Sequence, residues 1–384
     1  MQEPKSRAAS EAASVEGPTI VISANSCWNI VNFRGGLIRA LRDAGYRIVV
    51  AAPEDEHTPR LADLGADFVP VPINSAGLSP VEDLRLFARY LKVFRELRPV
   101  AFLGFTVKPN IYGSLAARSV GSRVINNVSG LGTVFIKPGP VTALVTQLYR
   151  LAFRRSATIF FQNKDDLELF TRIGIARQEQ AKLLPGSGVD LERFSPRQGA
   201  AASDAFRFLL VGRLLWDKGV AEYVEAARIL SKLRPDVRFQ VLGPAGANNR
   251  TAVPSWVVER WRAEKVIEHL GASDDVRTAI ERADCIVLPS YREGLPRALL
   301  EGSAMGKPLI ATDVPGCRDV VVEGETGYLC AARSADSLAA AMLKMLDTPA
   351  AERLRMGAAG RRKVEQEFCE TRVIAKYLEA LGTR

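Results

Sequence analysis

Short continuous apolar runs, separated by helix-length segments, constrain the fold of this chain more than any other feature. These runs do not alternate apolar and polar residues, which is the pattern of strands that are covered on both faces. They predict parallel β-sheets with crossover helices. In the first half, the predicted strands are 19–23, 47–53, 67–73, 100–105, 123–129 and 157–162, with helices over 35–45 and 81–97, the latter with Leu84, Phe87, Leu91 and Phe94 on one face.

The same pattern starts again after a stretch rich in Gly, Ser, Ala and Pro, so the 384 residues predict two domains. The second set of predicted strands is 206–213, 238–243, 266–271, 283–290 and 308–313, with only helices after Gly327. We expect an α/β protein with two Rossmann-like, doubly wound domains that face a cleft, where ligands bind at the carboxyl ends of the strands. The predicted parts are a disordered tail (1–18), a first domain (19–187), a linker (188–205), a second domain (206–365) and a final helix packing back on the first domain (366–384).

Composition excludes several classes of protein. Apolar residues make up 47% and charged residues 25%, as in ordinary globular chains, and no apolar run is long enough to span a bilayer or to form a signal peptide. The five cysteines are scattered without CxxC pairs, which suits a reducing cytoplasm and argues against a zinc site. Only two histidines occur, so a histidine-rich metal centre is not expected.

Basic residues are concentrated in one part of the chain. The net charge is +9, and residues 84–164 contain thirteen Lys or Arg against one acid. Such a surface suits nucleotides, nucleic acid or an anionic membrane. The segment 141–156 is amphipathic, with Leu144, Leu148 and Leu151 near one face and Arg150, Arg154 and Arg155 beyond them. Two interpretations stay open for it: a helix that rests on an anionic membrane leaflet, or a crossover helix with a solvated basic face.

Two carboxylates follow the predicted strand 283–290. Glu293 lies in the loop, and Glu301 lies about two turns into the helix that Pro296 is predicted to begin. The backbone N–H groups near Gly294 and Leu295 are then available to a phosphate or sugar. Taken alone, the two acids are better explained as a surface acid and a structural helix acid.

Two cations follow the predicted strand 206–213. Arg213 ends the strand, and Lys218 precedes Gly219 at the start of a helix. A guanidinium and an ammonium so placed suit a diphosphate leaving group. A salt-bridged Arg and a solvated Lys would produce the same pattern.

The first domain offers weaker signals. Arg34, Gly35 and Gly36 are predicted to end a loop that follows the first strand and to form an anion-binding backbone nest, although a plain tight turn fits them too. Lys108 and Asn110 follow the predicted strand 100–105. By themselves they are explained as a lysine and a capping residue at a helix start.

In their order and spacing, these motifs resemble the family 4 retaining nucleotide-sugar glycosyltransferases with the GT-B fold. The resemblance runs from Thr19 to about Phe368 and includes the segment 314–330. It implies that Arg213 and Lys218 hold the donor diphosphate, and that Glu293 with the backbone of Gly294 and Leu295 contacts the donor sugar. It further implies that Glu301 binds the ribose, that His269 packs beside the base, that Gly243 is a substrate-binding residue, and that Arg34, Gly35 and Gly36 face the phosphates and acceptor.

Three first-domain motifs resemble a branch that extends lipid-linked oligosaccharides in bacteria: NFRGGLIRAL, FTVKPNIYG and NVSGLGTVF. The resemblance implies a UDP-sugar donor, a sugar on polyprenyl diphosphate as acceptor, transfer of a hexose or N-acetylhexosamine, and no nucleic-acid partner. Lys108 and Asn110 are then acceptor-side residues. The enzyme is expected in the cytoplasm, peripherally attached to the inner face of the cell membrane, and without a metal or other cofactor.

Two departures from that family pattern affect the mechanism. The first-domain motifs lack the histidine that many members carry, and the chain has no DxD sequence for a divalent ion. A front-face transfer with retained configuration is expected. The acidic segment around His57 is interpreted as a cap of the next helix, with a metal cluster as the alternative. The rival functions are a UDP-N-acetylhexosamine 2-epimerase of the same fold and a non-catalytic protein that binds anionic lipid or nucleic acid.

Overall fold

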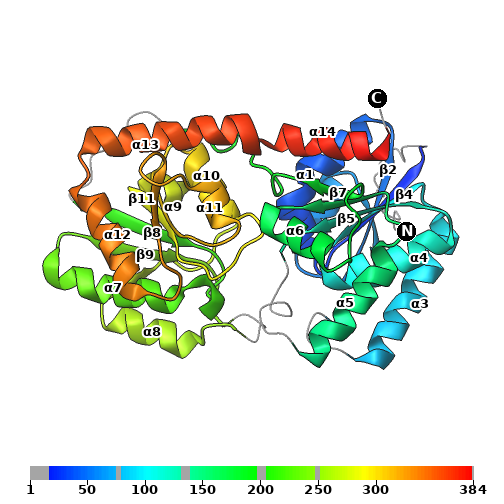
Figure 1. Cartoon of the computed structure of the whole chain (residues 1–384), viewed down its shortest axis with the longest axis horizontal. Coiled ribbons are helices and arrows are strands. Elements are labelled where there is room, and N and C mark those ends of the chain that lie inside the picture. The colour runs from blue at the N-terminus through cyan, green and yellow to red at the C-terminus, as the bar shows by residue number, and fades with distance from the viewer. Residues whose placement is uncertain (1–16, 75–78, 131–138, 197–204, 247–250, 383–384) are drawn as a thin grey trace, which may run out of the picture. The chain divides into compact units, whose positions relative to one another are not determined.

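The computed structural model describes residues 17–74, 79–130, 139–196, 205–246 and 251–382 (Figure 1). Contacts divide these residues into two compact units, which are 17–74 with 79–125, and 126–382. Most of the predicted disordered tail and residues 197–204 of the predicted linker lie outside the described residues. The domain boundaries inferred from the sequence stay a prediction.

The first sheet has the strand order β3-β2-β1-β4-β5-β6-β7. The pairs β1–β2, β1–β4, β2–β3 and β6–β7 are parallel, as the continuous apolar runs predict. The strands are β1 (Thr19–Ser23), β2 (Arg47–Ala52), β3 (Asp67–Pro70), β4 (Ala101–Phe105), β5 (Arg123–Val128), β6 (Thr158–Phe161) and β7 (Ala181–Leu183).

One hydrophobic core of the first unit includes Val21, Tyr90 and Phe102. Its helices are α1 (Cys27–Asp43), α2 (Arg60–Asp63), α3 (Pro80–Leu97), the π-helix η1 (Pro109–Gly113) and α4 (Ser114–Ser119).

The apolar face expected for α3 meets the core in part. Phe94 is buried, and Phe87 and Leu91 pack against the core half-buried, but Leu84 is 68% exposed. Sequence analysis did not name the other residues that the helix buries, which include Leu86, Tyr90 and Val93. The hydroxyls of Tyr90 and Ser23 lie 2.7 Å apart, and this buried contact explains why a polar residue belongs to the buried face.

The second sheet lies entirely in the second unit and has the order β10-β9-β8-β11-β12-β13. All its neighbouring strands are parallel. The strands are β8 (Arg207–Val211), β9 (Arg238–Leu242), β10 (Glu268–His269), β11 (Cys285–Leu288), β12 (Leu309–Thr312) and β13 (Gly327–Cys330). The expectation of only helices after Gly327 is wrong, because β13 pairs with β12 at the sheet edge. Four residues are too few for a periodic signal.

Helices bury both faces of the second sheet. Successive strand residues point to opposite faces, so Leu210 joins the core on one face and Leu209 the core on the other. The second unit contains α5 (Pro140–Phe153), α6 (Lys164–Arg172), the 3-10 helix η3 (Trp216–Lys218), α7 (Val220–Leu233), α8 (Ser255–Ala263), α9 (Arg277–Arg282), α10 (Arg297–Ala304), α11 (Cys317–Val320), α12 (Ala335–Asp347), α13 (Ala350–Lys363), the π-helix η4 (Val364–Phe368) and α14 (Glu370–Leu381).

The last helix of the chain, α14, packs on β5 and β6. The ring of Tyr377 lies 5.0 Å from that of Phe160, and its hydroxyl accepts a hydrogen bond from Asn127. Lys376 donates to the carbonyl of Leu183 at the end of β7. The terminal segment therefore returns to strands that are about 200 residues earlier in the chain.

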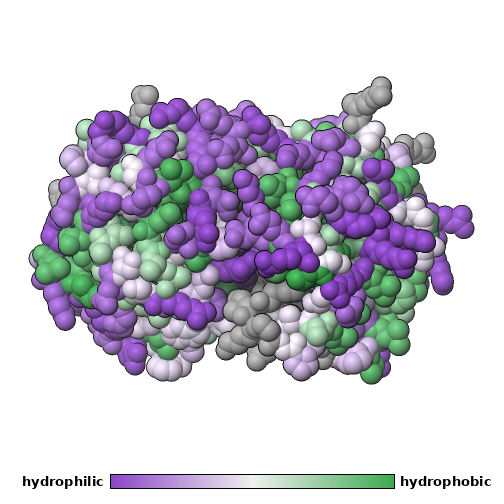
Figure 2. Space-filling model, viewed as in Figure 1, coloured by the Kyte–Doolittle hydropathy of each residue, from purple (hydrophilic) through white to green (hydrophobic). Residues whose placement is uncertain are grey.

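The face of the molecule in Figure 2 is mainly polar, with apolar side chains in separate patches. Over the part of the chain that the structure describes, no helix has the combination of length and apolar character that a bilayer span requires. Both sheets are parallel and carry helices, so the predicted α/β class with two Rossmann-like folds is confirmed.

Candidate functional site

The strand order of the second sheet reverses between β8 and β11. Open parallel sheets bind ligands at such switch points, beyond the carboxyl ends of the strands. The register pairs Cys285 with Phe208 and Ile286 with Leu209, so the two strands end side by side. The loops that follow them carry Arg213 with Lys218, and Glu293 with Gly294.

The structure brings Lys218 and Glu293 into direct contact. The Lys218 ammonium donates to Oε1 of Glu293, which also accepts a 2.7 Å hydrogen bond from the Ser290 hydroxyl. The side chains of Lys218 and Glu293 are 24% and 12% exposed, so the pair is sheltered but open to solvent. An ammonium and a carboxylate at one switch point suit a ligand that has an anionic part and a hydroxylated part.

The turn that holds Glu293 is fixed by its backbone. The N–H of Glu293 donates to the carbonyl of Pro315. Gly316 has φ +83°, and a Cβ there would lie 2.6 Å from the carbonyl oxygen of Gly294 and 2.7 Å from that of Glu293. The Asn163 amide, at the N-cap of α6, donates to both of these carbonyls. Glycine is therefore required at 316 for the close approach of two loops.

A buried ion pair anchors the residue before Glu293. The Arg292 guanidinium donates to Asp166, whose side chain is fully buried in the first turn of α6. Burial raises the pKa of the Asp166 carboxyl above its usual range, while Arg292 and Asn163 oppose that rise. The pair ties the site loop to α6.

Glu301 lies in the second turn of α10 and is buried. Its Oε1 accepts a 2.7 Å hydrogen bond from Arg297, one turn earlier on the same helix. Burial raises the pKa of Glu301, and the Arg297 charge counteracts this rise. The helix begins at Arg297 with Pro296 as its N-cap, one residue later than predicted.

The other predicted donor-side residues lie at the ends of β8, β9 and β10. Arg213 is exposed. Gly243 has φ +155°, and a Cβ there would lie 1.8 Å from the carbonyl oxygen of Gly212, so the two strands approach closely at this point. His269 lies in β10 as predicted, with Nε2 2.9 Å from the carbonyl oxygen of Gly243.

The predicted anion nest of Arg34, Gly35 and Gly36 is wrong. Helix α1 begins at Cys27, where the Ser26 hydroxyl caps it by accepting from the Asn29 N–H, so all three residues lie inside the helix. Their N–H groups therefore belong to a helical segment and do not form a free loop. Arg34 is buried with its guanidinium 4.2 Å from the Phe105 ring centre.

The acidic segment around His57 caps a helix, but not the one that was predicted. Asp55 accepts from the backbone N–H of Trp28 in the first turn of the preceding helix α1, and also from that of His57. The following helix α2 has Pro59 as its N-cap, with no side-chain hydrogen bond. Among the described residues, no group of three His, Cys, Asp or Glu side chains is arranged to hold a metal ion.

The two acceptor-side candidates differ in accessibility. Lys108 lines a cavity of the first unit and forms a 2.8 Å ion pair with the buried Asp83. Asn110 is 1% exposed in the π-helix η1.

Sequence analysis did not identify Ser290, Asn163 or the Asp166–Arg292 pair. Ser290 is the last residue of a predicted strand, and Asn163 follows another, so their strand-end positions were a usable signal. The contact of Asn163 with the Glu293 turn joins residues 130 positions apart, and no local pattern indicates it.

Two family models match the chain in succession. The model "Glycosyl transferase 4-like" matches residues 20–163, and "Glycosyl transferases group 1" matches residues 192–363. The chain belongs to the family 4 glycosyltransferases.

Relatives and solved structures agree with this assignment. The chain is 27% identical over 369 residues to the N,N'-diacetylbacillosaminyl-diphospho-undecaprenol α-1,3-N-acetylgalactosaminyltransferase of Campylobacter jejuni, covering 91% of this chain and 95% of the relative. It is 24% identical to the Escherichia coli UDP-Gal:α-D-GlcNAc-diphosphoundecaprenol α-1,3-galactosyltransferase, over 72% of this chain and 74% of the relative. Anabaena HepE, crystallised with UDP and glucose, has the same fold with a TM-score of 0.78 at 17% identity, over 96% of this chain and all of that one.

Proposed function

We propose that this glycosyltransferase moves a hexose or N-acetylhexosamine from a UDP-sugar to a sugar carried on polyprenyl diphosphate, in the assembly of a bacterial surface glycan. The Campylobacter and Escherichia coli relatives carry diphospho-undecaprenol sugars in their names. HepE was crystallised with UDP. The observation that carries the proposal in this chain is the contact of Lys218 with Glu293 at the switch point of the second sheet.

The donor would bind across the loops that follow β8 and β11. Lys218 and the exposed Arg213 would hold the diphosphate, and Glu293 with the backbone of Gly294 and Leu295 the transferred sugar. Glu301 would accept from the ribose, with Gly243 and His269 beside the base. The Lys218–Glu293 pair supports this arrangement, because the ammonium can turn from the carboxylate to an arriving diphosphate without loss of a charge-assisted hydrogen bond.

We assign a front-face reaction that retains the anomeric configuration. The bond between the sugar C1 and the diphosphate oxygen breaks, the acceptor oxygen bonds to C1 on the same face, and its proton passes to the departing diphosphate. The chain's contribution is to stabilise the charge that develops on the diphosphate through Lys218 and Arg213. Removal of one such donor typically costs ~10²–10³ in turnover.

We further propose that the chain attaches peripherally to the inner face of the cell membrane through α5. Val145, Tyr149 and Phe153 of this helix face the core, whereas Leu144 and Leu151 are each 50% exposed. Exposed leucines next to the exposed Arg154 and Arg155 suit an anionic leaflet. The sequence-derived division, with a first domain at 19–187 and a second at 206–365, is proposed as the functional one.

A panel of nucleotide sugars, incubated with the enzyme and a short-chain undecaprenyl-diphosphate-linked sugar, tests the proposal. We expect a glycolipid product from a UDP-sugar, with the anomeric configuration of the donor in its NMR spectrum. Incubation of UDP-N-acetylhexosamine without acceptor separates the rival isomerase, since an epimerase forms the epimer and a transferase does not. An epimer without any glycolipid product would overturn the proposal.

A further inference from the structure

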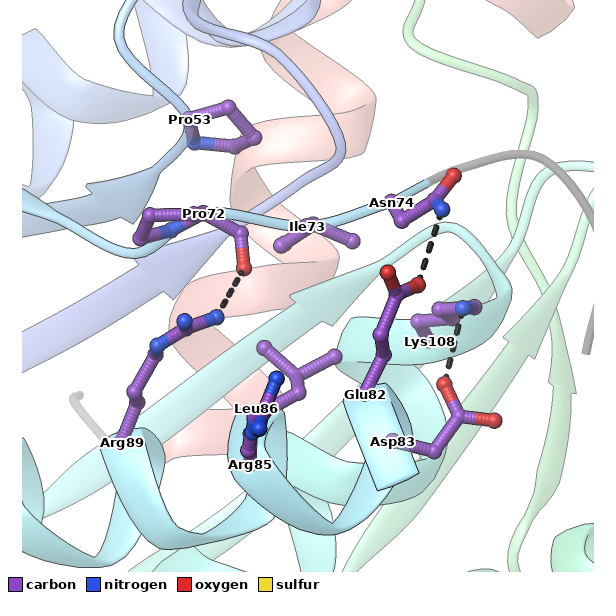
Figure 3. A pocket seen from close by; sticks show the side chains of 10 residues that line it. All are labelled: Pro53, Pro72, Ile73, Asn74, Glu82, Asp83, Arg85, Leu86, Arg89 and Lys108. Carbon is purple, nitrogen blue, oxygen red and sulfur yellow. Dashed lines mark hydrogen bonds and ion pairs between the residues drawn. The ribbon is translucent and has the colours of Figure 1, made fainter. Parts of the chain in front are cut away.

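The first unit contains a cavity of about 350 Å³ that no donor-binding residue lines. It lies beyond the ends of β2 and β3, against the first turns of α3. Figure 3 shows Glu82 and Arg89 reaching from α3 toward Asn74 and Pro72, with Arg85 between them on the same helix. Its lining is completed by Pro53, Pro72, Ile73, Asn74, Asp83, Leu86 and Lys108.

Two polar pairs organise one side of this cavity. The Asn74 amide donates a 2.8 Å hydrogen bond to Glu82. Lys108 pairs with Asp83 at 2.8 Å, and their side chains are 12% and 8% exposed. An amide and carboxylates at a cavity wall are the groups that bind sugar hydroxyls, and their mutual contacts hold them in place.

The other side of the cavity is cationic. The Asp83–Lys108 pair is neutral as a unit, which leaves one carboxylate, Glu82, against the guanidinium groups of Arg85 and Arg89. Arg89 donates one N–H to the carbonyl of Pro72, and the guanidinium fork has further donors. Both arginines are exposed and lie one turn apart on α3. Two guanidinium groups so placed can bind the oxygens of one phosphate group.

We propose that this cavity holds the glycosyl phosphate portion of the acceptor, with the sugar ring against Asn74 and Glu82 and its phosphate against Arg85 and Arg89. The inference rests on the proposed function, because it assigns the acceptor of that reaction to a place in the first unit. The apolar surfaces of Pro72 and Ile73 would pack against the ring face.

Soluble sugar phosphates test the assignment. N-acetylglucosamine 1-phosphate should inhibit transfer competitively against the lipid-linked acceptor and non-competitively against the UDP-sugar. N-acetylglucosamine without the phosphate should inhibit at least about tenfold more weakly. Inhibition that competes with the UDP-sugar, or equal potency of the two compounds, would overturn the assignment.

Two matched arginine variants on α3 provide a second test of the cavity assignment. Arg85→Gln should raise the acceptor KM about tenfold and leave the donor KM unchanged. Arg95→Gln, an exposed arginine of α3 outside the cavity lining, should change neither. Equal changes of the acceptor KM in the two variants would contradict the cavity assignment.

Calorimetric titration of the sugar phosphate into the free protein separates this inference from the proposed function. Binding that Arg85→Gln abolishes, in a protein that transfers no sugar to any lipid acceptor, would support the cavity and refute the transferase proposal. Sugar transfer by a protein that does not bind the sugar phosphate would support the transferase proposal and refute the cavity assignment. A lipid-linked acceptor and a free sugar phosphate both carry a sugar ring and a phosphate group. Tighter binding of the lipid-linked compound would identify it as the natural ligand of the cavity.

Discussion

Replacing Gly316 by alanine should displace Glu293 in the proposed donor site, although Gly316 itself is not one of the proposed donor-binding residues. Gly316 has φ +83°, and its added Cβ would lie 2.6 Å from the Gly294 carbonyl oxygen and 2.7 Å from that of Glu293. Both neighbours are backbone atoms, so the turn that carries Glu293 must move to accept the methyl group. We expect sugar transfer to fall by about 10²-fold, as for a displacement of about 1 Å in a catalytic arrangement.

The effect on stability has two parts, and a second glycine separates them. Alanine in the left-handed region costs about 1–2 kcal/mol, and the forced contact adds ~1–3 kcal/mol. Gly324 has φ +75° with nothing within 4 Å of its added Cβ. Gly324→Ala should therefore show the conformational cost alone and keep its donor affinity.

Urea denaturation of both variants, with UDP-sugar turnover measured on the same preparations, provides the comparison. Gly316→Ala should lose more free energy of unfolding than Gly324→Ala and should alone lose turnover. If the two variants lost equal stability and kept equal turnover, the close approach of the loops at Gly316 would not position Glu293.

Three further perturbations test separate parts of the account. Glu293→Gln should bind UDP at least as tightly as wild type in calorimetry, because a carboxylate near the diphosphate is removed, yet should transfer sugar ~10²-fold more slowly; weakened UDP binding would contradict the separate roles. Asp166→Asn should flatten the pH dependence of stability. The pKa of Asp166 in the folded state is raised above the ordinary 3.8, so the folded protein retains a proton that the unfolded chain releases. The free energy of unfolding of wild type should therefore fall as the pH rises from the ordinary pKa through the folded-state pKa. Equal slopes of unfolding free energy against pH in the two proteins would contradict the burial argument. Replacing Leu144 and Leu151 together by serine should abolish flotation with anionic vesicles without lowering turnover of a water-soluble acceptor analogue, and undiminished flotation would remove α5 from membrane attachment.

Strand-end reasoning placed Lys218 and Glu293 in loops that follow two strands of the second sheet. Apolar runs located β8 and β11, and parallel strands place the loops that follow them at one edge of the sheet. The pairing of β8 with β11, which brings Lys218 to Glu293, comes from the structure, because the strand order is not encoded in local patterns. The contact with Asn163 is not encoded locally either, because it depends on packing between segments that are far apart in the chain.

Local errors arose where two physical signals competed. Consecutive glycines at 35 and 36 suggested a turn, but the cap at Ser26 starts α1 before them, and a Cβ added at Gly35 would lie 3.5 Å from Leu64. In α3, helical spacing grouped the exposed Leu84 with Phe87, Leu91 and Phe94, which contact the core, and only tertiary contacts separate it from them. The edge strand β13 was missed because pairing with β12, rather than its own short apolar run, stabilises it.

The affinity of Lys218→Ala for UDP tests the central claim that this ammonium binds the donor diphosphate. A charge-assisted hydrogen bond contributes about 1.5–3 kcal/mol, so calorimetry should show UDP binding weakened by about 10- to 150-fold. Uridine affinity should be unchanged, and Lys232→Ala, which removes an exposed lysine of α7, should bind UDP like wild type. UDP affinity equal to that of wild type in Lys218→Ala would contradict the account.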